Sequence, residues 1–366
     1  MVLLPIREQG ASNVIRKSAL CSCLLLGAAM AAMGQSRQES LDRCRSADPD
    51  AKINGCTALI QAGQDTTESL SVIYNNRGIA YDDKGDYDRA IQDFSEAIHL
   101  NPNAEGAYYG RGYAYKKKRD YDRAIQDFNE AIHLNPNFER AYYDRGNAYI
   151  DKDDYDRAIQ DFDEAIHLNS SGANNYNNRG VAYLRKGNYD RAIQDFNEAI
   201  QLNSNDTTAY LNRGGAYFAQ PNLTAAIADL EHTISAAPSS GAAVSAVVML
   251  HVIMKRQGHD DMQQLARVAA AADLSKWPGP VLKLDLGQMA ANEVMMAATN
   301  PGSDMQKWQV CEANYFTGED ALSRHQRTTA LTRLKAAREG CPKGDPDYAA
   351  ALAELKRLSA SAAPVK

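Results

Sequence analysis

The chain has 366 residues, with 40 lysines and arginines against 46 aspartates and glutamates, and a net charge of −6 at pH 7. This acidic balance argues against a nucleic-acid-binding protein, because no part of the chain carries the continuous basic stripe that such a surface needs. The length would suffice for two conventional domains, but the sequence repeats itself, and a repeat array grows by addition of units.

Residues 1–34 have the order of a secretory signal peptide. Basic residues precede an apolar stretch, residues 19–33, whose length of about 15 residues is short of the roughly 20 that span a bilayer. We expect residues 1–34 to be removed, together with Cys21 and Cys23, and the mature protein to be periplasmic or secreted with no stable membrane span.

Four cysteines remain beyond residue 34, and an even number after a signal peptide favours disulfides. Of the three ways to pair them, proximity in the sequence favours Cys44 with Cys56 and Cys311 with Cys341. The alternative is four buried thiols in a protein that never leaves the cytoplasm.

Residues 35–70 predict atypical capping helices at the N-terminus. The segment 51–60 echoes 89–98, but it lies 38 residues upstream, so a short insertion breaks the register of the repeat that follows. An atypical first unit is expected, because it covers the exposed end of the stack. A disulfide between Cys44 and Cys56 would join its helices.

Residues 71–240 contain five repeats of 34 residues. Within the first repeat, apolar residues at helical spacing predict two antiparallel helices, with a turn at Gly85 between them and an end at Pro102. Neither helix can bury its apolar side alone, so stacked repeats must supply a continuous core. The recurring glycines, which allow two helices to approach closely, are Gly78, Gly112, Gly146, Gly180 and Gly214.

This pattern resembles the tetratricopeptide repeat. The positions that carry the resemblance in the first repeat are Tyr74, Gly78, Tyr81, Ala90, Phe94, Ala97 and Pro102. The resemblance implies an all-α fold, a right-handed α-solenoid of helix hairpins with degenerate capping helices at both ends. In this family, ligands usually lie in a concave groove lined by the first helix of each repeat.

Carried over position by position, the resemblance implies a peptide-binding groove whose residues are Asn75, Asn76, Ile79, Tyr109, Tyr113, Tyr143, Asp144, Asn147, Asn177, Val181, Leu211 and Asn212. Tyrosine and asparagine are adaptable contact residues that suit an extended or helical peptide. The alternative is that these residues only solvate a spacer. Asn75 and Ile79 stand where chaperone-binding members carry the first Lys and Asn of a carboxylate clamp, so a heat-shock chaperone is not the expected partner.

Charged and polar residues also recur within the repeats. An arginine precedes each glycine and an aspartate lies on each second helix, from Arg77 and Asp93 in the first repeat onwards, which predicts a forked ion pair between the two helices. His99, His133 and His167 also recur, but stacked repeats lie about 10 Å apart, which is too far for shared metal coordination at about 2 Å. We expect exposed histidines and no metal site.

Residues 241–310 predict a divergent helical region. Helices are expected over 242–257 and 260–273, and the prolines of the segment 276–280 predict a break after them.

Residues 311–344 return to the repeat register, with Gly318 at the glycine position, and predict a degenerate sixth repeat. Its two helices would bring Cys311 and Cys341 to the same end, where a disulfide that closes about 30 residues contributes roughly 3 to 4 kcal/mol. Residues 345–366 predict a C-terminal capping helix and tail.

Residues 277–358 carry a second resemblance. A Trp-Pro-x-Pro break, a Leu-Gly pair and a Tyr-Phe-x-Gly segment follow one another as in the C-terminal region of bacterial envelope lipoproteins of the NlpI type. This resemblance implies a non-enzymatic adaptor that brings cell-wall hydrolases and proteases together.

No nucleophile elbow, P-loop, zinc motif or catalytic dyad occurs in the sequence, so we expect no enzyme and no cofactor. The leading hypothesis is an adaptor of the bacterial cell envelope that binds peptide segments of partner proteins in the groove. The alternative is a self-associating structural solenoid with no peptide ligand, in which the groove packs against a second copy.

Overall fold

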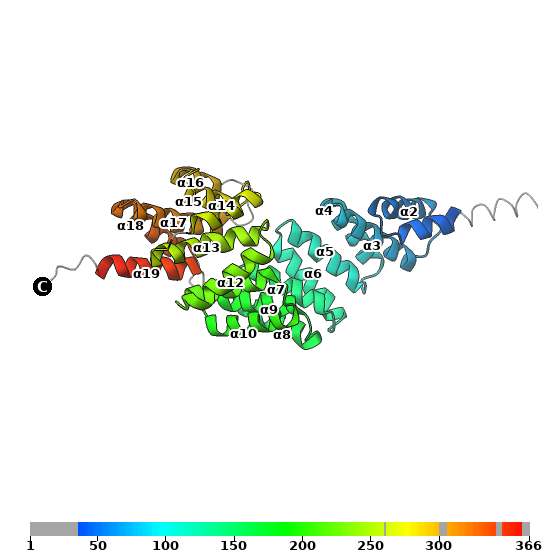
Figure 1. The fold of residues 1–366 in the computed structure, drawn as a ribbon. Helices are drawn as coiled ribbons and strands as arrows, with labels where there is room; N and C mark the ends of the chain where they lie inside the picture. Colours follow the sequence, from blue (N-terminus) through cyan, green and yellow to red (C-terminus); the bar gives the residue numbers. More distant parts are fainter. Residues whose placement is uncertain (1–35, 260, 300–305, 342–345, 361–366) are drawn as a thin grey trace, which may run out of the picture. The chain divides into compact units, whose positions relative to one another are not determined.

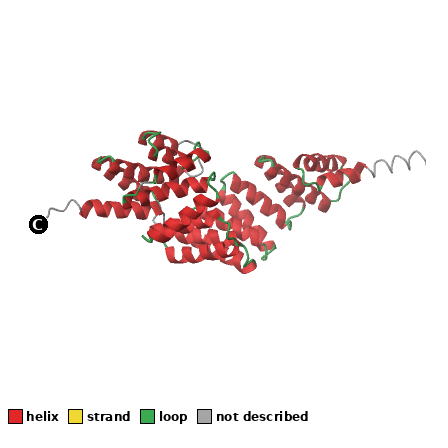
Figure 2. Cartoon of the chain, in the orientation of Figure 1, coloured by secondary structure: helices red, strands yellow, loops and turns green. Residues whose placement is uncertain are grey.

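The computed structural model describes residues 36–259, 261–299, 306–341 and 346–360, and every regular element in those ranges is a helix (Figures 1 and 2). The predicted signal peptide, residues 1–34, lies outside the described residues. The chain divides into two compact units, Met1–Asp144 and Arg145–Lys366. The all-α, solenoid-type architecture predicted from the sequence is confirmed.

The first unit consists of consecutive helices that pack as hairpins. After a helix over residues 36–44 come α2 (Pro49–Ala62), α3 (Thr67–Asp83), α4 (Tyr87–Leu100), α5 (Glu105–Lys117), α6 (Tyr121–Leu134) and the start of α7 (Glu139–Asp151). Each pair of neighbours from α2 to α6 is in contact, and α3 also touches α5. The first helices of adjacent repeats therefore lie side by side.

The second unit continues the repeats and adds the C-terminal helices. Its elements are the rest of α7, α8 (Tyr155–Leu168), α9 (Ala173–Arg185), α10 (Tyr189–Leu202), α11 (Thr207–Ala219), α12 (Leu223–Ala236), α13 (Gly241–Gln257), α14 (Met262–Ala271), α15 (Gly279–Asp285), α16 (Ala291–Ala298), α17 (Gln306–Ser323), α18 (Arg327–Gly340) and α19 (Pro346–Ala360). The break predicted at the proline-rich segment 276–280 lies between α14 and α15.

Each second helix begins at a polar cap. In the first repeat the Asp86 carboxylate accepts a hydrogen bond from the Arg89 backbone N–H, which satisfies one of the amides that a helix start leaves without a partner. Asp120, Asp154, Asn188 and Asn222 do the same in the later repeats. The helix starts are thus set locally by residues that recur with the period of the sequence.

A glycine and a phenylalanine hold the two helices of a repeat together. Phe94 is only 1% exposed, and a Cβ atom placed on Gly78 would lie 2.8 Å from its ring. That distance is shorter than van der Waals contact, so the close approach predicted for the glycine is confirmed. Gly318 packs in the same way where α17 and α18 form a hairpin. A Cβ atom placed on Gly318 would lie 3.0 Å from Leu334 Cγ.

The predicted arginine–aspartate pairs are present and forked. In the first repeat Arg77 donates from Nε and Nη2 to the two carboxylate oxygens of Asp93, at 2.7 and 2.8 Å. The equivalent pairs are Arg111–Asp127, Arg145–Asp161, Arg179–Asp195 and Arg213–Asp229. The aspartates are 4–6% exposed, so each pair is a largely buried contact between the helices of one repeat.

The same arginines also reach the hairpin that precedes them. Arg111 Nη1 donates to Ser95 Oγ at 3.1 Å, and Arg213 Nη1 donates to Asn197 Oδ1 at 2.6 Å. Arg77 Nη1 donates to Thr57 Oγ1 at 3.1 Å, and Thr57 lies 38 residues before Ser95, the offset seen in the sequence. Each of these three guanidinium groups therefore joins three helices, and the atypical first hairpin is held by the same contact.

Both expected disulfides are present. Cys44 and Cys56 lie with Cα atoms 4.6 Å apart and join the helix over residues 36–44 to α2. Cys311 and Cys341 lie 5.1 Å apart and join the start of α17 to the end of α18. The first disulfide is part of the small core of the N-terminal hairpin, because both cysteines are almost fully buried.

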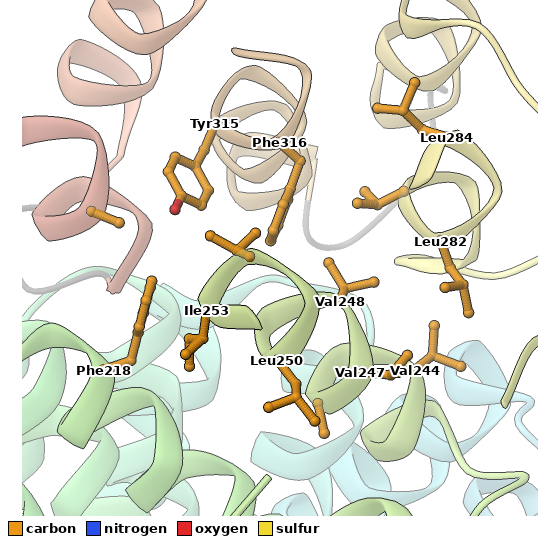
Figure 3. Close-up of a cluster of buried hydrophobic side chains, with 14 of the residues drawn as sticks. Phe218, Val244, Val247, Val248, Leu250, Ile253, Leu282, Leu284, Tyr315 and Phe316 are labelled. Atoms are coloured by element: carbon orange, nitrogen blue, oxygen red, sulfur yellow. The ribbon is translucent and has the colours of Figure 1, made fainter. Parts of the chain in front are cut away.

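The C-terminal helices of the second unit share one core with the fifth repeat. Val244 of α13 lies beside Leu282 of α15, Val248 of α13 lies near Phe316 of α17, and Phe218 of α11 lies beside Ile253 of α13 (Figure 3). Because α19 contacts both α11 and α18, the C-terminal helix packs on the repeats and on the α17–α18 hairpin. None of the described helices combines the length and hydropathy that crossing a membrane requires.

Candidate interaction surfaces

In the first unit, two of the predicted groove residues are engaged within the fold. The Tyr109 hydroxyl donates to Asp144 Oδ2 at 2.7 Å, and Lys116 donates to the other oxygen of the same carboxylate. The Tyr109 ring also packs on Phe138, with centroids 4.9 Å apart. Burial, together with the charge of Asp144, raises the pKa of Tyr109. The side chains of Tyr109 and Asp144 therefore make packing contacts and hydrogen bonds within the first unit.

One side of α3, which we call the α3 face, differs from the surroundings of Tyr109 and Asp144 because it carries exposed aliphatic side chains. Its residues follow helical spacing and are Val72, Asn75, Asn76, Ile79, Asp82 and Asp83. Val72 is 56% exposed and Ile79 is 38% exposed, and they are among the few large aliphatic side chains with such exposure in the described part of the chain. Asn75 Oδ1 is buried and accepts no hydrogen bond. The α3 face thus presents apolar surface, with an unsatisfied acceptor buried beneath it.

A hollow of about 420 Å³ adjoins the α3 face at its N-terminal end. Val72, Ile73 and Asn76 form one wall, and Arg37 and Leu41 from the helix over residues 36–44 form another. Because aliphatic side chains line part of the hollow, it can receive an apolar side chain of a ligand.

The C-terminal end of the α3 face is acidic. The last turn of α3 has no basic residue, while Asp82 and Asp83 both lie in it. Burial, followed by the charge of Asp83, raises the pKa of Asp82 to about 6, and Lys117 opposes this rise. Asp82 Oδ1 is buried without a hydrogen-bond partner. Lys84, the residue that follows, is paired with Asp50.

In the second unit, the predicted groove asparagines bond to one another. Asn212 Nδ2 donates to Asn177 Oδ1 at 3.1 Å, and Asn177 Nδ2 donates to Asn178 Oδ1 at 3.1 Å. Asn178 Nδ2 in turn donates to Asn147 Oδ1 at 2.8 Å. This row of amides runs across α7, α9 and α11, so these side chains connect neighbouring repeats.

The C-terminal helices cover part of the same side of the second unit. Leu211 packs against the C-terminal core, and α11 is in contact with α19. Lys307 Nζ donates to Asp153 Oδ2 at 2.8 Å, and the guanidinium of Arg185 lies 3.4 Å from the ring centroid of Trp308. These contacts fasten the start of α17 to the ends of α7 and α9.

A buried polar cluster lies among the C-terminal helices. His251 Nδ1 is 2.7 Å from Asp261 Oδ1, and burial raises the pKa of Asp285 to about 7 despite the nearby imidazole. Asp261 Oδ2 and Asp285 Oδ2 are buried without hydrogen-bond partners. Across the described ranges, no group of three or more histidine, cysteine, aspartate or glutamate side chains could hold a metal ion. The recurring His99, His133 and His167 are exposed, as expected.

Comparison with protein families finds the tetratricopeptide repeat in two sets of segments. One family model matches residues 71–104 and 106–138, and a second, also described as a tetratricopeptide repeat, matches residues 143–207 and 177–241. These segments coincide with the hairpins that the Arg–Asp pairs join. The chain carries tetratricopeptide repeats.

One solved structure shares the fold over most of the chain, and others are similar to about half of it. A tetratricopeptide repeat protein from Parabacteroides merdae is 19% identical, covers 76% of this chain and 99% of its own, and has a TM-score of 0.51. The MamA protein is 26% identical over 46% of this chain and 91% of its own, with a TM-score of 0.43. YrrB, described as a TPR protein with an unusual peptide-binding site, is 22% identical over 52% of this chain and 96% of its own, with a TM-score of 0.45. A search of curated proteins gave no match.

The tetratricopeptide pattern placed the predicted groove residues on the first helices of the repeats, but it did not show which of their side chains already have partners within the fold. Asn75, Asn76 and Ile79 lie on the α3 face, whereas Tyr109 and Asp144 bond to each other. Tyr113 lies beside Lys117, which is 5.0 Å from its ring centroid, and Tyr143 is half-buried with contacts inside the fold. Val181 is half-buried in the fourth repeat's core.

Two residues of the α3 face were missed by sequence reasoning. Val72 lies seven residues before Ile79, and Asp82 lies three residues after it, so both share its side of the helix. This helical spacing could have identified both residues from the sequence. They were missed because the groove positions of the tetratricopeptide family do not include them.

Proposed function

We propose that the protein is a non-enzymatic adaptor that binds segments of other proteins on the α3 face. Tetratricopeptide repeats are in general protein–protein interaction modules, and stacked repeats provide extended surfaces for partners. One observation supports this proposal most directly. Val72 and Ile79 are exposed on the first helix of the first repeat, whereas the corresponding side of the second unit is occupied by its own amides and C-terminal helices.

We further propose that the adaptor works in the bacterial cell envelope. The order of basic and apolar residues in the segment 1–34 supports export, and the pairing of Cys44 with Cys56 and of Cys311 with Cys341 suits an oxidising compartment. The C-terminal resemblance to NlpI-type lipoproteins makes cell-wall hydrolases and proteases the first partners to test.

A selection from a random peptide library displayed on phage tests the binding function. The purified chain should enrich a family of peptides, and the double change Val72→Ser and Ile79→Ser should abolish that enrichment, because it removes the exposed aliphatic surface. Leu202→Ser is the matched control, since Leu202 is 42% exposed but lies on a second helix, α10. Equal enrichment by the double variant would refute binding on the α3 face.

The second candidate function is self-association through the same surface. The exposed pair Val72 and Ile79 favours it, because aliphatic surface of this kind can also pack against a second copy. Sedimentation of the purified chain separates the two functions. A dimer that the Val72→Ser and Ile79→Ser changes dissociate would support self-association, and a monomer that binds peptides would support the adaptor.

A further inference from the structure

The two ends of the α3 face differ in chemistry, and this difference limits the class of ligand that the face can bind. It begins at the hollow beside Val72, continues past the exposed Ile79, and ends at Asp82 and Asp83. One end therefore suits an apolar group and the other end suits a positive charge. This inference rests on the proposed function and adds the chemistry of the partner.

The acidic end has three reasons to attract a cation. The carbonyl end of a helix carries partial negative charge, and in α3 no basic residue of the last turn offsets it. Asp82 and Asp83 add two carboxylates to that end. Lys84 is paired with Asp50, and Lys117, which lies over the ring of Tyr113, offsets only part of the negative charge at Asp82.

Two buried acceptors on the α3 face lack donors. Asn75 Oδ1 and Asp82 Oδ1 are both buried with no hydrogen bond. Buried acceptors without donors are uncommon in folded proteins, because leaving them unsatisfied is unfavourable. Both oxygens are shielded from solvent, so a ligand cation meets the exposed part of the half-buried Asp82 side chain and not its buried oxygen.

The length of the α3 face sets the spacing within the ligand. Val72 and Asp82 are ten residues apart along α3, which corresponds to about 15 Å at the rise of an α-helix. An extended peptide advances about 3.3 Å per residue, so it covers that distance in about four to five residues.

We propose that the α3 face binds an extended segment of a partner protein that carries an aliphatic side chain and, about four to five residues away, a lysine or arginine. The aliphatic side chain occupies the hollow beside Val72, and the cation contacts the Asp82 carboxylate, beside which Asp83 adds a second, exposed negative charge.

The same phage-displayed random library tests this inference through the composition of the enriched peptides. The unchanged chain should enrich peptides with an aliphatic residue and a lysine or arginine at this spacing. Asp82→Lys should reverse the preference and enrich acidic peptides. A synthetic copy of the most enriched basic peptide should bind Asp82→Asn about 10- to 100-fold more weakly, the usual effect of losing a hydrogen bond to a charged group.

Asp83→Asn is the matched control, because it removes the same net charge from an exposed neighbour. It should weaken binding several-fold less than Asp82→Asn. Peptides that are enriched without basic residues, or that bind both variants equally, would refute the inference and leave the proposed function standing. Failure to enrich any peptide would instead contradict the proposed function itself. A dimer formed through the α3 face would also overturn the inference, because the occupant would be a second copy.

The affinity for the basic peptide should depend on pH. Only ionised Asp82 attracts the cation, so the affinity should fall as the pH drops through about 6. The charged groups that act on it are Asp83 on α3 and Lys117 on α5, and Lys117 in turn lies beside Tyr113 on α5 and Tyr87 on α4. In Asp82→Asn the fall near this pH should disappear, and an unchanged pH profile in that variant would contradict the role of Asp82.

Discussion

Replacing Arg111 with methionine tests whether the recurring arginines hold neighbouring hairpins together. In the folded chain Arg111 makes three hydrogen bonds, two to Asp127 at 2.8 Å each and one to Ser95 at 3.1 Å. Methionine keeps much of the apolar stem but none of the donors. The Asp127 carboxylate is then left in the interface with no cation.

The expected cost follows from the burial of the pair. Breaking a buried ion pair by removing one partner costs about 3 to 5 kcal/mol. The Asp127 side chain is 7% exposed and that of Arg111 is 22% exposed, so water offsets part of the loss and the lower end, about 3 kcal/mol, is expected. Adding Asp127→Leu removes the stranded carboxylate, so the double variant should be more stable than Arg111→Met alone.

Hydrogen exchange of the amides in α5 and α6 is the appropriate assay, because a repeat array can open one part at a time. The control is Lys118→Met, which breaks the exposed pair with Asp88 and should change the opening free energy by less than about 1 kcal/mol. If Arg111→Met cost no more than this control, the buried pair would not be a determinant of hairpin stability.

Gly110→Ala should lower the thermal midpoint, because its Cβ would lie 2.6 Å from a buried phenylalanine ring, whereas Gly106→Ala on the same helix meets no atom and should raise stability by up to about 1 kcal/mol; equal effects would contradict the close packing. Burial raises the pKa of Asp285 to about 7, so on raising the pH this carboxyl group loses its proton in the unfolded chain before it does so in the folded chain. The free energy of unfolding should therefore fall as the pH rises from about 4 to 7. Urea unfolding of Asp285→Asn should lack this pH dependence, and an unchanged pH dependence would rule out Asp285 as the cause. Replacing Cys311 and Cys341 with serine should cost about 3 to 4 kcal/mol in urea unfolding, and no loss would show that the hairpin is stable without its crosslink.

Most of the fold could be predicted from the sequence because its determinants repeat. A residue such as Gly78 must face the same partner in every copy, so the period itself identifies the contact, and the ion pair of Arg77 with Asp93 follows for the same reason. The bond from an arginine to the preceding hairpin, for example from Arg111 to Ser95, could not be predicted. It depends on how consecutive hairpins stack, and the sequence within one repeat does not specify this.

The candidate surface could be predicted only in part. The repeat register placed Ile79 and Asn75 on the same side of α3, because helical spacing fixes which residues share a side. It could not show that Asn177 and Asn212 bond to each other, since this requires the distance between neighbouring helices. It also could not show that Trp308 lies on Arg185, because residues so far apart in sequence meet only through the path of the intervening helices.

The arginine that joins three helices bears on how such a chain can lengthen. Donor and acceptors stand at constant separations, with Asp127 sixteen residues after Arg111 and Ser95 sixteen residues before it. A gene duplication that inserts one whole period would therefore bring in a matched set of partners. An insertion of another length keeps the bond only where the acceptor still reaches the guanidinium, as Thr57 does from twenty residues before Arg77. The chemistry of one side chain thus favours the duplication of whole repeats.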